Sequence, residues 1–335
     1  MDYYPDPDQL LWLFVFRMVF ATFCIVLNLF LLIVFIFSRS YRQSFHNWLT
    51  TMMAFADVIV GIGIFTRVFV YITGYPRTSE GYSRSVCLTI AIPQILGILW
   101  SQSVMANMAN DRLKAVKNLM AYGNISFLKE ATKIFIEWII VAVAVILFAY
   151  LSLPEGRSVQ CSTGSIASHP FLYAYVITGL LKGTAVLIIY YRALKLLKEK
   201  TQDARSKVVG INVHKAVFKR VKRLLFWYIT FCVAPLWIVF VFLLMNLNEN
   251  ILAYGALFVG MTAETFSVAS FFVLSWKNKE IKGIFNRILL RKSSIEPTTL
   301  PSHISYIKSS REDKPRMIIV TSFVAIFDFN NTYND

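Results

Sequence analysis

Long apolar runs alternate with short polar connections along most of the chain. About 20 consecutive apolar residues are enough to cross the hydrocarbon core of a bilayer as a helix. Seven runs reach that length, at residues 10–37, 48–73, 86–112, 131–151, 170–197, 221–245 and 251–276. They are continuous, unlike the short alternating segments of a membrane β-barrel. The pattern therefore predicts an all-α membrane protein in which residues 10–276 form a seven-transmembrane helix bundle.

The composition and the charge distribution support this interpretation. Only 16% of the residues are charged, against about 25% in soluble domains. The predicted connections on one side of the bundle are rich in Lys and Arg, whereas those on the other side hold only Arg77, Arg84 and Arg157. Basic loops stay in the cytoplasm, so we expect an extracellular N-terminus and a cytoplasmic C-terminus. The net charge of +15 then reflects membrane topology and suits contact with anionic lipid, not nucleic acid.

Three segments lie outside the predicted bundle. Residues 1–9 would form a short extracellular N-terminus. Residues 277–292 would form an amphipathic juxtamembrane helix on the membrane surface, and 293–335 a disordered cytoplasmic tail. The helix is predicted from five apolar residues that recur with helical spacing, namely Ile281, Ile284, Phe285, Ile288 and Leu289. The apolar segment 317–327 in the tail is too short to span a membrane.

Cysteine placement predicts one disulfide bond. Cys24 and Cys232 lie within apolar runs, whereas Cys87 and Cys161 lie at or beyond the ends of runs on the predicted outer side. Disulfides form where the surroundings are oxidising, as they are outside the cell. We therefore expect Cys87 and Cys161 to join the connection after the fourth run to the start of the third.

Several ionisable residues lie inside predicted spans, where they are costly and commonly functional. Asp57 is in the middle of the second span, so we expect it to be protonated, hydrated, bound to an ion or held by structural hydrogen bonds. Arg17, Arg67 and Glu264 lie in the outer half. We expect Glu264 to pair with Arg67 or Arg17 beside a cavity for a polar or anionic ligand, or to form a purely structural pair. Lys182 either snorkels or hydrogen-bonds across the bundle.

With these residues in place, the chain resembles the rhodopsin-like G-protein-coupled receptors over roughly residues 10–290. The stretch LTTMMAFADVIVG around Asp57 is similar to the family's LAxAD stretch, and Cys87 precedes the Asp111-Arg112 pair at the family's spacing. Further matching positions in the first, fourth and sixth runs are Asn28, Trp138 and Pro235. The resemblance implies that this seven-helix bundle is a receptor.

Three family motifs are altered. The DRY motif reads Asp111-Arg112-Leu113, and the CWxP motif reads Cys232-Val233-Ala234-Pro235, without its tryptophan. The NPxxY motif is replaced by the stretch SFFVL that begins at Ser270. Such divergence is similar to that of the nematode serpentine chemoreceptors. The nearest alternative is another peptide or small-molecule receptor.

The resemblance implies a function and a set of site residues. The protein would be a chemosensory receptor of the plasma membrane. It would bind an extracellular small molecule or peptide and activate a heterotrimeric G protein. Coupling would involve Asp111, Arg112, Tyr190 and Tyr191. An internal polar pocket, able to hold a sodium ion as the one possible cofactor, would comprise Asn28, Asp57, Ser101 and Ser267. The ligand-binding wall would comprise Arg67, Tyr71, Gln94, Ile95, Ile98, Tyr175, Trp237, Phe240, Met261 and Glu264.

Other functions are less well supported by the sequence. Gln94 occupies the position where aminergic receptors carry an acid, so a biogenic amine is not expected, and the seventh run lacks the lysine that binds retinal in opsins. The chain contains no HExxH, Walker or GxSxG motif, so neither catalysis nor a catalytic metal is expected. A transporter or channel would need a path of charged residues across the bundle, and the in-span charges gather in the outer half. A non-signalling membrane scaffold is the third possibility.

Overall fold

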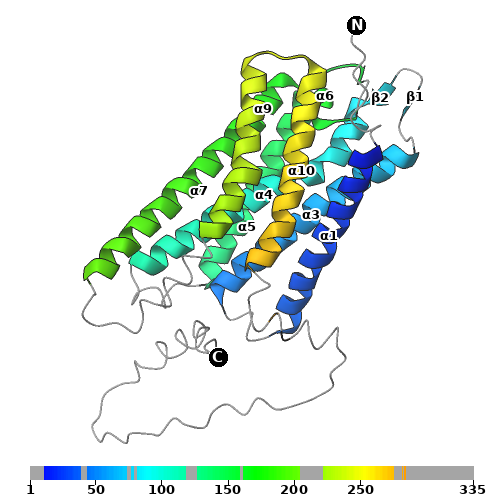
Figure 1. Ribbon diagram of the computed structural model, residues 1–335. Coiled ribbons are helices and arrows are strands. Elements are labelled where there is room, and N and C mark those ends of the chain that lie inside the picture. Colours follow the sequence, from blue (N-terminus) through cyan, green and yellow to red (C-terminus); the bar gives the residue numbers. More distant parts are fainter. Residues whose placement is uncertain are drawn as a thin grey trace, which may run out of the picture.

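The computed structural model describes residues 11–38, 44–73, 77–78, 81–117, 127–158, 161–203, 222–274, 281 and 283. Seven helices in this part of the chain are long and apolar enough to cross a membrane, which confirms the predicted bundle (Figure 1). In chain order they are α1 (Leu11–Phe37), α3 (Phe45–Thr73), α4 (Arg84–Lys117), α5 (Phe127–Leu151), α7 (His169–Asp203), a sixth span over Lys222–Leu244, and α10 (Glu249–Leu274).

Helix α4 lies at the centre of the bundle. It packs against α3, α5 and α7, and most of its length is buried although its sequence is only moderately apolar. Helix α1 packs against α3 and also against α10, so the first and last spans are neighbours. Residues on α4 are therefore placed to contact three of the six other spans directly.

Glycines allow α3 and α4 to approach closely. A Cβ atom added at Gly97 would lie 2.6 Å from Val60 Cγ2 and 2.8 Å from the Ala56 carbonyl oxygen. One added at Gly63 would lie 2.5 Å from the backbone nitrogen of Gln94. Small residues at helix contacts in membranes let backbones pack against each other. This contact fixes the position of Gln94 along the axis of α3.

One end of the bundle is covered by a small sheet and a short helix. Strands β1 (Arg77–Thr78), β2 (Gly81–Ser83) and β3 (Arg157–Ser158) form an antiparallel sheet. Helix α6 (Thr163–Ile166) follows β3 and packs against α4 and α10. The predicted disulfide Cys87–Cys161 is present, with a Cα–Cα distance of 5.5 Å, and joins this segment to α4. We call this the disulfide end, and the opposite end, which holds Arg112, the basic end.

The sixth span contains a π-helical turn. Residues Ile229–Val233 form η3, and α9 (Ala234–Leu244) continues the span. The Ala234 N–H donates to the Ile229 carbonyl five residues earlier. Apart from Pro235, the buried positions recur every three or four residues, and the single step of five falls across this turn: Leu224, Tyr228, Val233, Leu236, Val239, Leu243. The π turn therefore keeps one face of the span directed into the bundle.

The segments predicted outside the bundle are largely beyond the described residues. This holds for residues 1–9, for 293–335, and for most of 277–292. Within the last of these, Ile281 and Gly283 are helical. Ile281 is buried against Leu31 of α1 and Phe271 of α10.

Replacing Gly97 tests the close packing of α3 on α4. We expect Gly97→Ala to destabilise the purified protein by about 1–3 kcal/mol, because the added methyl group meets the α3 backbone and overpacks the contact. Thermal unfolding in lipid nanodiscs measures the effect. Gly283→Ala is the matched control, since a Cβ atom there meets no atom within 4 Å. A melting temperature for Gly97→Ala equal to that of the control contradicts the packing argument.

Candidate functional site

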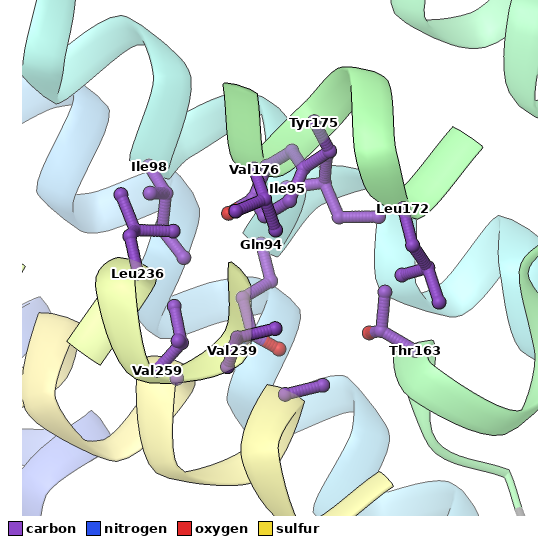
Figure 2. Close-up of a pocket in the computed structure, with 12 residues that line it drawn as sticks. Gln94, Ile95, Ile98, Thr163, Leu172, Tyr175, Val176, Leu236, Val239 and Val259 are labelled. Carbon is purple, nitrogen blue, oxygen red and sulfur yellow. The ribbon is translucent and has the colours of Figure 1, made fainter. Parts of the chain in front are cut away.

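A cavity lies between the spans toward the disulfide end. Its walls come from α4, α7, α9 and α10, and Thr163 of α6 lines it as well (Figure 2). The free space that the lining side chains enclose measures about 30 Å³. A single buried water molecule needs about 10–15 Å³ on this measure. The cavity as it stands therefore has room for about two water molecules, and a small organic molecule would fit only if the surrounding spans moved apart.

Four of the predicted wall residues line this cavity. They are Gln94, Ile95 and Ile98 on α4 and Tyr175 on α7. The side chains come from two helices, and Figure 2 shows Gln94 in the middle of the group of lining residues, with its side chain running toward Val239. On α4 the spacing of three and four residues puts the three side chains on one face. The sequence therefore identified the α4 side of the cavity.

The other predicted wall residues lie elsewhere. Trp237 is 50% exposed on the outer surface of α9, because Leu236 and Val239 take the inward face of that helix. Its ring packs against Phe240 at a centroid distance of 5.7 Å, and neither residue lines the cavity. Met261 is half-buried outside the lining. The side chain of Tyr71 is beyond the described part of the chain, and Arg67 and Glu264 are engaged in other contacts.

The sequence analysis missed much of the lining. The missed residues are Thr163, Leu172, Val176, Leu236, Val239, Ala256, Val259 and Gly260. Those on α7 and on α10 recur with helical spacing. These two helices carry apolar residues on every face, so the sequence does not show which face lines a cavity. The α9 residues could be placed only with knowledge of the π turn. Thr163 belongs to a connection whose path is fixed by the disulfide.

Arg67 holds the covering segment in place. Its Nη2 atom donates to the Cys161 carbonyl oxygen at 2.6 Å, beside the disulfide. Arg84 at the start of α4 donates to the carbonyl oxygens of Ser165 at 3.0 Å and Ile166 at 3.4 Å. Gly164 packs so closely on α10 that an added Cβ atom would lie 2.4 Å from the Leu252 carbonyl oxygen. The segment over the cavity is thus fixed to α3, α4 and α10.

The predicted ion pair of Glu264 forms with Arg17. Arg17 Nε on α1 lies 3.6 Å from Glu264 Oε1 on α10, and the two side chains are 4% and 0% exposed. Arg67 is also within electrostatic reach of Glu264. The contact joins the first and last spans. Because neither residue of the pair lines the cavity, it does not present a charge to a ligand.

Asp57 lies in an internal polar cluster below the cavity. Ser101 of α4 and Ser267 and Ser270 of α10 face its carboxylate, but no hydrogen bond to either carboxylate oxygen is completed among the described residues. Nearby, Asn28 donates to the Cys24 carbonyl oxygen at 2.9 Å, and the Cys24 thiol donates to the Asp57 carbonyl oxygen at 3.1 Å. The structure thus brings together all four predicted residues of the polar pocket.

The predicted coupling residues lie at the basic end. Arg112 Nε is 3.9 Å from Asp111 Oδ2, and both side chains are largely buried. Tyr190 of α7 is buried and within electrostatic reach of both. Tyr191 is 67% exposed and points out of the bundle, as expected for the next residue along a helix. Three of the four residues therefore form one cluster.

Comparison with known families gives a match over most of the chain. Residues 18–289 match the model of the serpentine type seven-transmembrane GPCR chemoreceptor Srsx. The chain belongs to this family of chemosensory receptors. Comparison with curated proteins gives no match. The family is one of receptors and is not an enzyme family.

In this Srsx receptor, the missing tryptophan of the CWxP motif is matched by tight packing around the residue that replaces it. Val233 stands where the CWxP motif has tryptophan, at the end of the π turn. It is buried in the same apolar cluster as Tyr228, Tyr190 and Met105. An added Cβ atom at Gly183 of α7 would lie 3.0 Å from Val233 Cγ2. A tryptophan at 233 would not fit this contact without movement of α7.

Lys182 of the Srsx receptor hydrogen-bonds across the bundle, which answers the question left open by the sequence. Its Nζ atom donates to Ser103 Oγ on α4 and lies 3.8 Å from Glu137 Oε1 on α5. Three spans are thus joined around one ammonium group. Since Glu137 is partly exposed, this pair lies at the outer surface of the bundle and apart from the cavity.

Removing one charge of the buried pair should destabilise the receptor. We expect Glu264→Gln to cost about 3–5 kcal/mol of stability, because Arg17 keeps its buried charge without a counter-ion. Thermal unfolding of the purified receptor in nanodiscs measures the loss. Adding Arg17→Met to the variant should recover most of it, since both buried charges are then gone.

The matched control for this variant is Glu130→Gln. Glu130 pairs with Lys114 at 3.4 Å and Lys133 at 3.2 Å, but its side chain is 22% exposed and both lysines are at least half exposed. We expect a loss of about 1 kcal/mol or less there. Equal losses for Glu264→Gln and Glu130→Gln would show that the Arg17–Glu264 pair has no special weight.

Proposed function

We propose that this chemoreceptor lies in the plasma membrane with its disulfide end outside, binds an extracellular small molecule in the cavity and activates a heterotrimeric G protein at its basic end. The observation that carries the proposal is the continuity of α4. The same helix provides Gln94 to the cavity and Asp111 and Arg112 to the basic end. The two places are eighteen residues apart, or about 27 Å along a helix.

The mechanism is a population shift. A ligand that packs better against one arrangement of α4, α7, α9 and α10 favours that arrangement, and it can shift the equilibrium only by that difference in affinity. Leu236 and Val239 of the cavity wall lie just beyond the π turn in the same span as Tyr228, which packs near Tyr190. A change in the wall is therefore mechanically connected to the surroundings of Arg112.

Replacing Arg112 tests the coupling role. We expect Arg112→Ala to abolish ligand-stimulated nucleotide exchange on a co-expressed G protein while ligand binding is retained, because Arg112 is far from the cavity. Lys114→Ala is the matched control, since Lys114 is an exposed cation two residues away, and it should signal normally. A ligand response that survives Arg112→Ala unchanged would remove Arg112 from the coupling mechanism.

We further propose that the Asp57 cluster holds a sodium ion. A buried carboxylate with incomplete hydrogen bonding, surrounded by the hydroxyl groups of Ser101, Ser267 and Ser270, offers the oxygen atoms that a small hard cation requires. The cation would also supply a positive charge to balance the negative charge of the buried carboxylate. These residues therefore fit the ion that the family resemblance implies.

Sodium dependence of stability tests this assignment. We expect the melting temperature of the purified receptor to be higher in sodium chloride than in choline chloride of equal concentration, since an ion that binds only the folded state stabilises it. Asp57→Asn should abolish the difference, whereas Asp111→Asn should preserve it. Identical melting temperatures of the unsubstituted receptor in the two salts would refute sodium binding.

A further inference from the structure

The cavity wall is uncharged in the part of the chain that the structure describes. Three charged side chains of the spans toward the disulfide end are engaged in other contacts: Arg17 pairs with Glu264, and Arg67 donates to the Cys161 carbonyl oxygen. A charged ligand would have to leave water without meeting an opposite charge in the wall, which costs far more than moving a neutral one. The cavity therefore selects against carboxylates and ammonium groups.

Gln94 is the main polar group of the wall. Its side chain is buried, with 6% exposure, and its Oε1 atom has no hydrogen-bond partner among the described residues. Leaving a buried polar atom without a partner costs about 1–3 kcal/mol. A primary amide both donates and accepts hydrogen bonds, so a ligand hydroxyl or carbonyl group can relieve this cost.

The space next to the Gln94 amide depends on a glycine. A Cβ atom added at Gly260 of α10 would lie 2.7 Å from Gln94 Nε2. A side chain at that position would occupy the approach to the amide. The rest of the wall is mainly aliphatic, with Ile95 and Ile98 on α4 and Val259 on α10. The wall therefore offers few hydrogen-bonding side chains, those of Gln94, Thr163 and Tyr175, within an apolar surface.

We propose that the ligand of this receptor is a neutral, mainly apolar small molecule with a hydroxyl or carbonyl group that hydrogen-bonds to the Gln94 amide. This inference rests on the proposed function, because it specifies the chemistry of the same cavity. It replaces the expectation of a polar or anionic ligand beside Glu264 and its arginine partner. The apolar body of the ligand packs against the aliphatic wall, and Gln94 sets its orientation.

Binding to the purified receptor in nanodiscs tests the proposal without a G protein. The probes are 1-hexanol, 2-hexanone, hexanoate and hexylamine at pH 7, which share one carbon chain and differ in charge. We expect 1-hexanol and 2-hexanone to raise the melting temperature saturably, and the two charged probes to have no such effect. The proposal is overturned if hexanoate or hexylamine stabilises the receptor as much as the neutral probes do. It is also overturned if neither 1-hexanol nor 2-hexanone stabilises the receptor.

The role of Gln94 is tested with a matched pair of variants. Gln94→Leu should weaken the binding of the neutral probes about tenfold, which corresponds to about 1.4 kcal/mol. Gln102→Leu is the control, because Gln102 is also buried on α4 with an amide oxygen that lacks a partner among the described residues, but it does not line the cavity. It should bind the probes as the unsubstituted receptor does.

A second variant keeps the test decisive if Gln94→Leu does not fold. Gly260→Ala places a methyl group against the Gln94 amide and should also weaken binding. Unchanged affinity in a folded Gln94→Leu or Gly260→Ala variant overturns the role of Gln94. The outcome is separable from that of the coupling proposal. Probe binding without nucleotide exchange counts against coupling only, and exchange stimulated by hexanoate counts against the ligand class only.

Discussion

In the hydrocarbon core of a membrane no water is present to hydrogen-bond a polar group, so the group must find a partner inside the protein. This constraint accounts for the contacts of many polar residues of the bundle. Arg17 meets Glu264, Arg67 meets the Cys161 carbonyl oxygen, and Lys182 meets Ser103 and Glu137. Threonines within the spans, such as Thr66 and Thr265, donate to the carbonyl oxygen four residues earlier. These contacts join helices or satisfy backbone groups, and none of them presents a charge to the cavity.

Gln94 and Asp57 are among the buried groups that depart from this rule, and each lies at a candidate site. Gln94 lies in the cavity wall with an amide oxygen that has no partner among the described residues, and the Asp57 carboxylate lies in a serine cluster that does not complete its hydrogen bonds. Ser101 of that cluster stands between Gln94 and Arg112 on α4. The two sites and the basic end are therefore aligned along one central helix, which suits a receptor whose ends must respond to each other.

The sequence was sufficient where a signal is carried by single residues or by run length. Apolar runs predicted the seven spans, and cysteine placement predicted the Cys87–Cys161 bond. In-span charges predicted that Glu264 pairs with either Arg67 or Arg17. The choice of Arg17 over Arg67 could not be made, because the group that engages Arg67 is a backbone carbonyl in a connection. The inward face of α9 was likewise out of reach, since the π turn shifts the phase of the helix and turns Trp237 outward. An apolar residue facing lipid and one facing a cavity look the same in a sequence.

The pairing of Arg17 with Glu264 has a consequence for biosynthesis. The ribosome makes α1 first and α10 last, so Arg17 enters the bilayer before its counter-ion exists. An arginine at the centre of a spanning helix costs about 2.5–3.5 kcal/mol on insertion. Arg17 lies near the start of the first span, where the cost is smaller, and the otherwise apolar sequence of α1 offsets it. Until the seventh span is in place, Arg17 therefore lacks the carboxylate with which it pairs in the complete bundle. Insertion of α10 brings that carboxylate and the packing of the last span against the first at the same time.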